Sequence, residues 1–270
     1  MDSDLKRNLL IKAKWAWRET LRMHKLSPET RVASSLSLVE ILVTLYYGGI
    51  LSFNAKDQYW EGRDRLIISK GHGSITLYPI LADMEYFSAD LLNDICKSGS
   101  FLGAIPDPVI PGYETVNGSL GHGLGVATGV ALALKKKKST SSVFVIVGDG
   151  ELYEGANWEA IMFAPQHCLD NLILIIDCNK VSMLDFTENI ISHLSLAKKF
   201  EAFGWNVTTV NGHDIEEVYL VLNGVKQKKM EKPTVIIANT IKGHGVEFLE
   251  KSHLSHVLSI SAEKIDQLLQ

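Results

Sequence analysis

The stretch VFVIVGDGELYEGANWEA, residues 143–160, joins an apolar run to a turn that is rich in acidic side chains. The apolar residues are followed by Asp149 between two glycines, and then by Glu151 and Glu154. A second run, LILIIDCN at 172–179, also ends in polar residues, and a helical stretch lies between the two runs. Continuous apolar runs of strand length are typical of parallel strands that are buried on both faces. The stretch therefore predicts a strand–helix–strand unit with a right-handed crossover.

The rest of the chain continues this alternation of strands and helices. Further strands are predicted at 65–70, 207–210 and 234–240, and helices at about 1–25, 35–47, 120–134, 158–166, 195–203 and 214–228. Residues 99–119 are rich in glycine and proline and are predicted to form a loop. We see no internal repeat and no composition break. The prediction is an α/β fold with one parallel sheet and helices on both faces, in a single domain spanning residues 1–270.

Composition excludes several classes of protein. The 270 residues carry a net charge of −4, so bulk electrostatics does not suggest nucleic-acid binding, and the basic run at 135–138 is interpreted as a solvated helix end. Three widely spaced cysteines fit reduced thiols better than a disulfide frame or a zinc site. The first ten residues lack the layout of a signal peptide, and no apolar run approaches about 20 residues. We therefore expect a cytoplasmic protein without a membrane span.

Polar loops follow four of the predicted strands. They read GHGS at 71–74, GDG at 148–150, DCNK at 177–180 and KGHG at 242–245. Ligands of parallel sheets bind at the carboxyl ends of the strands, so we expect the site where these loops meet. Neither GDGELY nor GHGLGV completes G-x-G-x-x-G, and no phosphate-binding G-x-x-x-x-G-K-S/T is present, which disfavours both dinucleotide and P-loop sites.

Asp149 and Asn179 follow neighbouring apolar runs, about thirty residues apart. A carboxylate and an amide oxygen are hard ligands, of the kind that Mg²⁺ or Ca²⁺ prefers. Two such ligands are too few for a tight all-protein site, but they suit an ion that also holds a diphosphate. The alternative is a strand-to-helix turn in which Asp149 serves only as a cap.

These features together resemble the transketolase family of thiamine diphosphate enzymes. The segments that carry the resemblance are GDG followed about thirty residues later by Asn, RDRLIISKGHGS, NGSLGHGLGVATGVALA, KFEAFGWNVTTVNGHD and TIKGHGVEFLE. The resemblance covers about residues 8–258 and implies a thiamine diphosphate-binding fold of the type that holds the diphosphate.

The resemblance also implies roles for individual residues. The metal ligands that it implies are Asp149, Asn179 and the backbone carbonyl of Val181. Those implied beside the cofactor are His72, Gly118, Leu120, Gly150, Glu154 and Asn179. Those implied in catalysis are His72, Glu154 and His256, and those implied at the substrate are Arg31, Ile105 and His256.

Within this set the implied functions differ. His72 and Gly150 would lie near the diphosphate, whereas Gly118 and Leu120 would border the thiazolium and aminopyrimidine rings. Glu154 matches a family glutamate in the hydrogen-bond network that links the two cofactor sites. Its neighbour Glu151 matches no functional position, and we expect it at the surface.

The chain departs from the family pattern where the family has substrate histidines. Arg31 replaces one of them, Ala104 or Ile105 replaces another, and the third corresponds to His256, next to Ser255 in place of the usual tryptophan. An apolar group suits a methyl group, and a guanidinium suits a carboxylate. The donor could therefore be a ketose, or a 2-oxo acid such as pyruvate that gives an acetyl unit to a keto-sugar. Other histidines could instead fill the vacant roles: His24, His122, His244 and His253.

The resemblance extends only over the first domain of full-length transketolases. The pyrimidine-binding domain, with the glutamate that activates the cofactor, is then expected on a partner chain, and the expected assembly is α₂β₂. The chain would be a transketolase-like transferase subunit that is inactive alone, because it lacks that acid. The alternative is a non-catalytic paralogue that binds a partner or a sugar, and intact Asp149, Asn179 and His72 argue against it.

Overall fold

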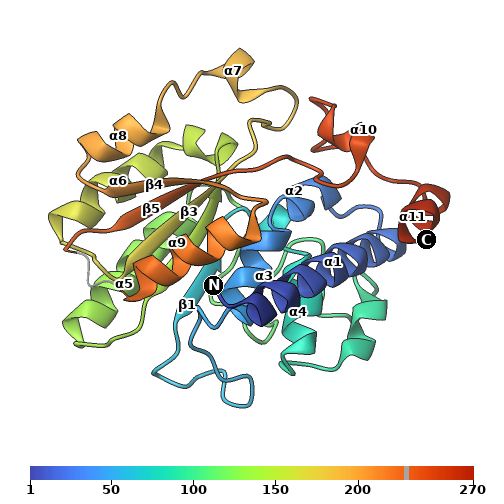
Figure 1. Cartoon of the computed structure of the whole chain (residues 1–270), viewed down its shortest axis with the longest axis horizontal. Coiled ribbons are helices and arrows are strands. Elements are labelled where there is room, and N and C mark those ends of the chain that lie inside the picture. Colours follow the sequence, from blue (N-terminus) through green and yellow to red (C-terminus); the bar gives the residue numbers. More distant parts are fainter. Residues whose placement is uncertain (228–230) are drawn as a thin grey trace.

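Five parallel strands form the sheet that the apolar runs predict (Figure 1). The computed structural model describes residues 1–227 and 231–270. Its strands are β1 (Arg65–Ile68), β2 (Val143–Gly148), β3 (Leu172–Cys178), β4 (Asn206–Asn211) and β5 (Thr234–Asn239). They are arranged in the order β1-β2-β3-β5-β4, and every neighbouring pair is parallel. The predicted α/β class is therefore confirmed.

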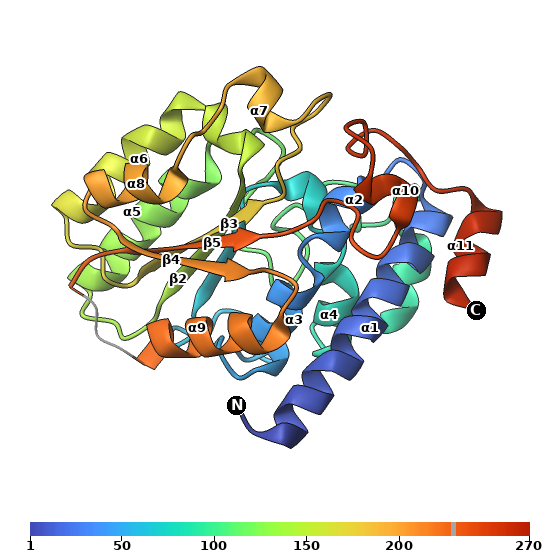
Figure 2. The same ribbon diagram turned by 45° about the horizontal axis from the view of Figure 1, so that its top comes forward.

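Helices cover both faces of the sheet (Figure 2). Alternate side chains of β2 point to opposite faces, so Phe144 and Ile146 join one apolar cluster while Val145 joins another. The first cluster is closed by α1 (Ser3–Leu26), α3 (Val39–Tyr47) and α9 (Ile215–Gln227). The second is closed by α5 (Gly123–Lys136), α6 (Gly155–Gln166) and α8 (Leu196–Ala202). Burial on both sides explains why β2, β3 and β5 are apolar without alternation, whereas the edge strand β4 is only partly buried.

One predicted helix is wrong in its extent. The single helix expected at 35–47 is two helices, α2 (Val32–Leu36) and α3, with a break at Ser37. The Ser37 hydroxyl donates to the Asp177 carboxylate at 2.7 Å, which ties the break to the end of β3. The other predicted helices are present with shifted ends, and the predicted end of α9 at residue 228 lies outside the described residues.

Several short elements were not predicted, because they are too short to show a periodic pattern. The 3₁₀ turns are η1 (Gly71–Gly73), η2 (Ala89–Asp94) and η3 (Gly150–Tyr153), and the helices are α4 (Leu77–Asp83), α7 (Thr187–Ile190), α10 (Glu247–Glu250) and α11 (Ala262–Leu269). In the described part of the chain, no helix is both long enough and apolar enough to cross a membrane. The three cysteines are free thiols.

His24 has a packing role and does not reach the predicted substrate site. Its ring is fully buried, and its Nε2 accepts a hydrogen bond from the backbone N–H of Ile260 at 3.2 Å. Because that nitrogen is an acceptor, the proton lies on Nδ1, which is 2.8 Å from the Thr30 hydroxyl. His24 thus links α1 to the segment that precedes α11, and burial lowers its pKa to about 4.

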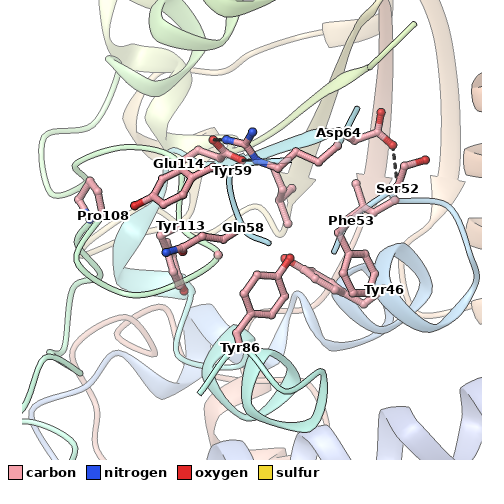
Figure 3. A pocket seen from close by; sticks show the side chains of 14 residues that line it. Tyr46, Ser52, Phe53, Gln58, Tyr59, Asp64, Tyr86, Pro108, Tyr113 and Glu114 are labelled. Atoms are coloured by element: carbon pink, nitrogen blue, oxygen red, sulfur yellow. Dashed lines mark hydrogen bonds and ion pairs between the residues drawn. The ribbon is translucent and has the colours of Figure 1, made fainter. Parts of the chain in front are cut away.

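A cavity lined by aromatic side chains lies at the amino end of β1, opposite to the strand ends that carry the polar loops (Figure 3). It is enclosed by α3, by residues 52–64 and by residues 108–114, and its volume is about 290 Å³. The cavity is separate from the predicted cofactor site.

Candidate active site

Asp149 and Asn179 lie at the carboxyl ends of neighbouring strands. Gly148 of β2 pairs with Asp177 of β3, and the Asp149 N–H donates to the Asp177 carbonyl at 3.2 Å. Both side chains are nearly inaccessible, with exposed fractions of 2% for Asp149 and 8% for Asn179. The strand register therefore places the two predicted metal ligands on the same edge of the sheet.

The Asp149 carboxylate is buried without a cationic partner. It accepts hydrogen bonds from the N–H groups of Gly150 at 2.9 Å and Lys180 at 2.7 Å, and it forms no ion pair with any described residue. Burial, followed by the nearby charge of Asp177, raises the pKa of Asp149 to about 6. The bond to Gly150 also caps η3, so the structure supports the turn interpretation as well. A buried carboxylate without a countercharge is stabilised by a cation.

Asp177 is the centre of a buried network that sequence patterns did not single out. Its carboxylate forms an ion pair with Lys70, and both side chains are almost fully buried. Its other partners are Ser37 Oγ at 2.7 Å, Asn179 Nδ2 at 3.0 Å and Thr240 Oγ1. Burial alone would raise the pKa of Asp177, but the Lys70 charge and these hydrogen bonds hold it below its usual value. The network fixes Asn179 beside Asp149 and neutralises Lys70.

Lys242 enters the same site from the loop after β5. Its ammonium donates to the Val181 carbonyl at 3.1 Å and lies 3.3 Å from His256 Nδ1. The lysine is 5% exposed, and burial, followed by the charge of Lys70, lowers its pKa to about 7. The predicted metal ligand Val181 thus already accepts a bond from Lys242. A carbonyl oxygen has two lone pairs, so it can still bind a second partner.

The predicted site residues His72 and His256 lie side by side. Their ring centroids are 4.9 Å apart in an edge-to-face arrangement. Burial and the charge of Lys70 lower the pKa of His72 well below its usual value, and burial and the charge of Lys242 lower that of His256 to about 3. Arg31 is exposed, but its charge also lowers both values. Both imidazoles are therefore neutral at pH 7, in surroundings that favour an anion.

Glu151 is not at the surface, contrary to the prediction. Its side chain is 3% exposed, and its carboxylate accepts hydrogen bonds from the N–H groups of Gly121 at 2.9 Å and Gly148 at 3.2 Å, and from the Ser69 hydroxyl. These donors come from three separate segments, which explains why no local pattern marks the residue. Burial raises the pKa of Glu151. Through these hydrogen bonds, Glu151 connects the end of β1, the end of β2 and the loop before α5.

Glu154 is exposed and packs on Gly121. Gly121 has a φ of +87°, and a Cβ there would come within 2.5 Å of the Glu154 Cβ, so the loop requires glycine at this position. Its role in a network between two cofactor sites stays a prediction.

The loop residues predicted near the cofactor rings also lie close to one another. Gly118 has a φ of +115°, and a Cβ there would lie 3.8 Å from Ile105 Cγ2. A Cβ on Gly71 would lie 3.4 Å from the same methyl group, so Ile105 borders the loop that carries His72. Ile105 is 47% exposed, and Leu120 is half-buried. The predicted substrate position of Ile105 is thus consistent with its place beside the cofactor loop.

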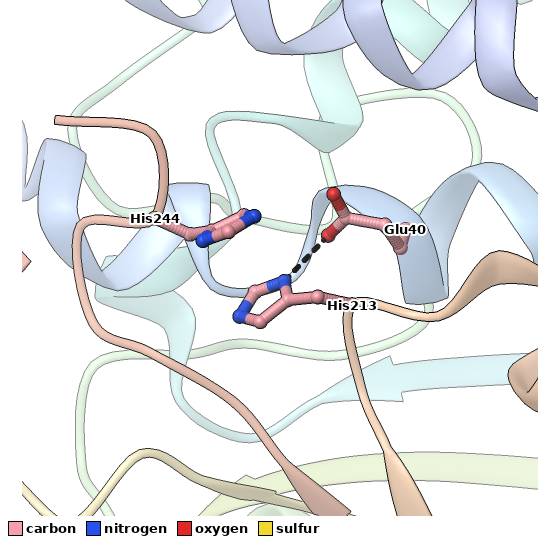
Figure 4. Close-up of side chains that lie close together, drawn as sticks. All are labelled: Glu40, His213 and His244. Carbon is pink, nitrogen blue, oxygen red and sulfur yellow. Dashed lines mark hydrogen bonds and ion pairs between the residues drawn. The ribbon is translucent and has the colours of Figure 1, made fainter.

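The other candidate histidines do not join His72 and His256. His122 is exposed at the start of α5, and His253 is exposed with its ring centroid 6.3 Å from that of Phe186. His244 stacks on His213 with ring centroids 3.7 Å apart, close to Glu40 (Figure 4).

The group formed by Glu40, His213 and His244 does not have the geometry of a metal centre. His213 Nε2 accepts from the Ile241 N–H at 2.8 Å, so its proton lies on Nδ1, which is 3.0 Å from Glu40 Oε2. Both nitrogens of His213 are therefore engaged. The two imidazole rings are nearly parallel, 23° apart, so their in-plane lone pairs do not converge on one point. His213 instead holds the backbone of the segment that carries Lys242.

The site residues fit a divalent ion and a diphosphate. Asp149 and Asn179 offer hard oxygen ligands, and the buried Asp149 carboxylate has no cation among the described residues. Lys242 offers a buried ammonium with no carboxylate bonded to it. An anion beside Lys242 and a cation beside Asp149 would each supply a missing partner.

Comparison with known proteins identifies related domains. Residues 31–270 match the family described as transketolase, thiamine diphosphate binding domain. A protein of Actinobacillus succinogenes named as one subunit of an apulose-4-phosphate transketolase is 43% identical over 241 residues, which cover 88% of this chain and 86% of that protein. The 6-deoxy-6-sulfo-D-fructose transketolase subunit SqwG of a Clostridium species is 37% identical over 233 residues, covering 86% and 84%.

A solved structure confirms the fold. The transketolase of Campylobacter jejuni superposes with a TM-score of 0.86 at 32% identity. The match covers 95% of this chain and 40% of that one, so this chain spans less than half the length of the solved enzyme.

Proposed function

This chain belongs to the transketolase family, and we propose that it is the diphosphate-binding subunit of a two-chain, thiamine diphosphate-dependent transketolase. The enzyme moves a two-carbon unit from a ketose donor to an aldehyde or ketone acceptor. The observation that carries the proposal is the position of Asp149 and Asn179 at adjacent strand ends, beside His72, His256 and Lys242. A chain that only bound a sugar or a partner would have no need of this buried arrangement.

In the proposed site, Asp149, Asn179 and the Val181 carbonyl hold Mg²⁺ or Ca²⁺, and Gly150, His72 and Lys242 lie at the diphosphate. Gly118 and Leu120 border the rings. When bound, thiamine diphosphate supplies the carbon nucleophile and the electron sink for breaking and forming the carbon–carbon bond. The low pKa values of His72 and His256 keep both rings neutral at pH 7, so either can accept or donate a hydrogen bond at a substrate hydroxyl.

Arg31 and Ile105 are proposed to shape substrate selection. The exposed guanidinium of Arg31 is close enough to His256 to lower its pKa, and it suits an anionic group such as a sugar phosphate. Ile105 gives an apolar surface beside Gly118. Relatives named as transketolases of a sugar phosphate and of a sulfosugar favour a ketose donor over pyruvate.

The outer face of α5 and α6 is proposed to bind the partner subunit. Three large apolar side chains are exposed there: Val126 at 43%, Met162 at 54% and Phe163 at 40%. A groove of about 370 Å³ runs between the helices, floored by Gly125 and Gly129. An apolar surface beside the site fits a protein interface better than solvent.

The partner would bring the pyrimidine-binding domain, and relatives that are themselves named as transketolase subunits support such a second chain. We propose an α₂β₂ assembly in which Glu154, exposed beside the groove, becomes part of the network between two cofactor sites. The free cysteines fit a reducing compartment such as the cytoplasm.

The test is reconstitution. This chain, its cognate C-terminal subunit, thiamine diphosphate and Mg²⁺ should together transfer a two-carbon unit from a ketose phosphate to an aldehyde, and omission of either chain should abolish turnover. Pyruvate, offered separately, should not serve as donor. Turnover by this chain alone would refute the requirement for a partner. A pair that forms but binds no thiamine diphosphate by calorimetry would refute the assignment of the site.

A further inference from the structure

The aromatic cavity at the amino end of β1 has polar groups without partners (Figure 3). Tyr46 is 6% exposed, yet its hydroxyl forms no hydrogen bond with any described residue. The same holds for the hydroxyl of Tyr86 and for the side-chain amide of Gln58, which also line the cavity. In Figure 3 the two hydroxyls point into the space between α3 and residues 108–114. A hydroxyl that lines a cavity can form a hydrogen bond with a molecule bound there.

The charged side chains of the cavity already have partners within the chain. Arg63 holds the Glu114 carboxylate through two hydrogen bonds, of 3.2 and 3.0 Å. Asp64 accepts from the N–H groups of Ser52 and Ser142, and it forms an ion pair with Lys226. An ionic ligand would have to compete with these pairs, whereas an uncharged ligand would leave them intact.

Aromatic rings supply the remaining walls. Phe53 lies between Tyr46 and Tyr86, with ring centroids at 5.4 and 6.1 Å respectively. Tyr59 and Tyr113 add two more rings. Aromatic faces combined with a few convergent polar groups are typical of small-molecule sites, and the volume of about 290 Å³ is near the lower limit for such sites.

We propose that this cavity binds a small uncharged polyhydroxy compound of about the size of a monosaccharide. Tyr46, Tyr86 and Gln58 bond its hydroxyls, and the aromatic faces pack on its carbon skeleton. The site is distinct from the proposed transferase site, and it does not depend on that proposal. Tyr113 connects the two, because its hydroxyl donates to the carbonyl of Ser74, directly after η1, at 3.1 Å.

The test uses the full chain and two uncharged probes that have no free carbonyl, myo-inositol and methyl β-D-xylopyranoside. Without a carbonyl, neither probe can react as donor or acceptor. Ligand-observed NMR should detect millimolar binding of at least one of them. Myo-inositol monophosphate and choline, as anionic and cationic probes, should bind more weakly.

Matched variants locate the binding. Tyr46→Phe and Tyr86→Phe remove only a hydroxyl, and each should weaken binding about 2- to 10-fold, as expected for one neutral hydrogen bond. Tyr219→Phe, on α9 outside the cavity, should leave it unchanged. The two cavity variants test the location of the site independently of each other, and urea unfolding curves would establish that each variant is folded. The proposal is overturned by absence of binding of both uncharged probes, by equal binding of a charged one, or by affinities that do not change in the cavity variants.

Discussion

Replacement of Asp177 by asparagine tests whether the buried network holds the site together. The amide has nearly the shape of the carboxylate, but it carries no charge. Lys70 has a side chain only 3% exposed, and it forms no other ion pair among residues 1–227 and 231–270. Removal of one partner from a buried ion pair leaves the other charge uncompensated and costs about 3–5 kcal/mol. For a chain of this size that corresponds to a fall in Tm of about 6–10 °C.

Asp170→Asn is the matched control. Asp170 pairs with Lys135 at the surface, where the two side chains are 36% and 38% exposed. An exposed pair of this kind contributes at most about 1 kcal/mol. Urea unfolding of the three proteins should therefore separate Asp177→Asn clearly from both wild type and control. A loss of stability no larger than that of Asp170→Asn would refute the role of the network.

The pH dependence of the same variant gives a second check. The pKa of the Asp177 carboxyl is lower in the folded chain than in the unfolded chain, where it is about 4. The contribution of Asp177 to the free energy of unfolding is therefore complete above about pH 4, and it is lost as pH falls through the lower pKa of the folded state. In Asp177→Asn, this loss of stability at acidic pH should be absent. An acid-unfolding profile with the same slope in variant and wild type would contradict the assignment.

Three further predictions concern single side chains. Asp149→Ala should abolish Mg²⁺-dependent binding of thiamine diphosphate by the assembled enzyme, and unchanged affinity in calorimetry would reject Asp149 as a metal ligand. The glutamine of His213→Gln can still accept a hydrogen bond from the Ile241 N–H, whereas the shorter side chain of His213→Asn reaches only Glu40. The asparagine variant alone should therefore bind the cofactor about tenfold more weakly. Equal affinities of the two variants would contradict this role of His213. Burial lowers the pKa of His24 to about 4, so the unfolded state binds more protons than the folded state between about pH 6.5 and 4. The free energy of unfolding should therefore fall by up to about 3 kcal/mol over this range. For His24→Gln, the free energy of unfolding measured in urea should depend less on pH, and an equally steep dependence would refute this assignment.

The sheet could be predicted from the sequence because its signal is local. The strands β2, β3 and β5 are buried on both faces, so each of them reads as an almost unbroken apolar run, and the helices between the strands determine the parallel direction. The edge strand β4 is only partly buried, and its sequence NVTTVN gives a weaker signal. The break at Ser37 could not be predicted in this way. It depends on a hydrogen bond to Asp177, which lies 140 positions further along the chain.

Glu151 shows the same limit within the site. Its neighbours in sequence are those of an exposed turn, and the groups that bury it are Gly121 and Ser69, from other segments. Resemblance to a family placed His72 and His256, and the structure brings their rings together. The roles of both histidines, like those of Asp149 and Asn179, remain predictions.

Lys70, Asp177 and Lys242 were missed for a different reason. All three lie in or beside the polar loops that follow the predicted strands, but a charged residue in a loop is usually solvated. Only the convergence of β1, β3 and β5 shows that these charges are buried together. These residues could have been predicted from their position in the sequence. Each of them follows an apolar run, and the ends of these runs lie at the same edge of the sheet.

The distribution of charge among these buried residues is the physical argument for the proposed cofactor site. Lys70 and Asp177 neutralise each other, so they contribute rigidity and add little net charge. Asp149 and Lys242 are buried nearby, and neither forms an ion pair within the described part of the chain. Burial disfavours the charged form of both groups, which is why the pKa of Asp149 rises to about 6 and that of Lys242 falls to about 7, and a ligand of opposite charge would favour the charged form of each. In the proposed site, a divalent ion would pair with the carboxylate and a diphosphate would pair with the ammonium, and the two ligands would also bind each other. The folded chain therefore has stability to gain from a metal–diphosphate ligand at this edge of the sheet, and that gain is the physical basis of the proposed cofactor site.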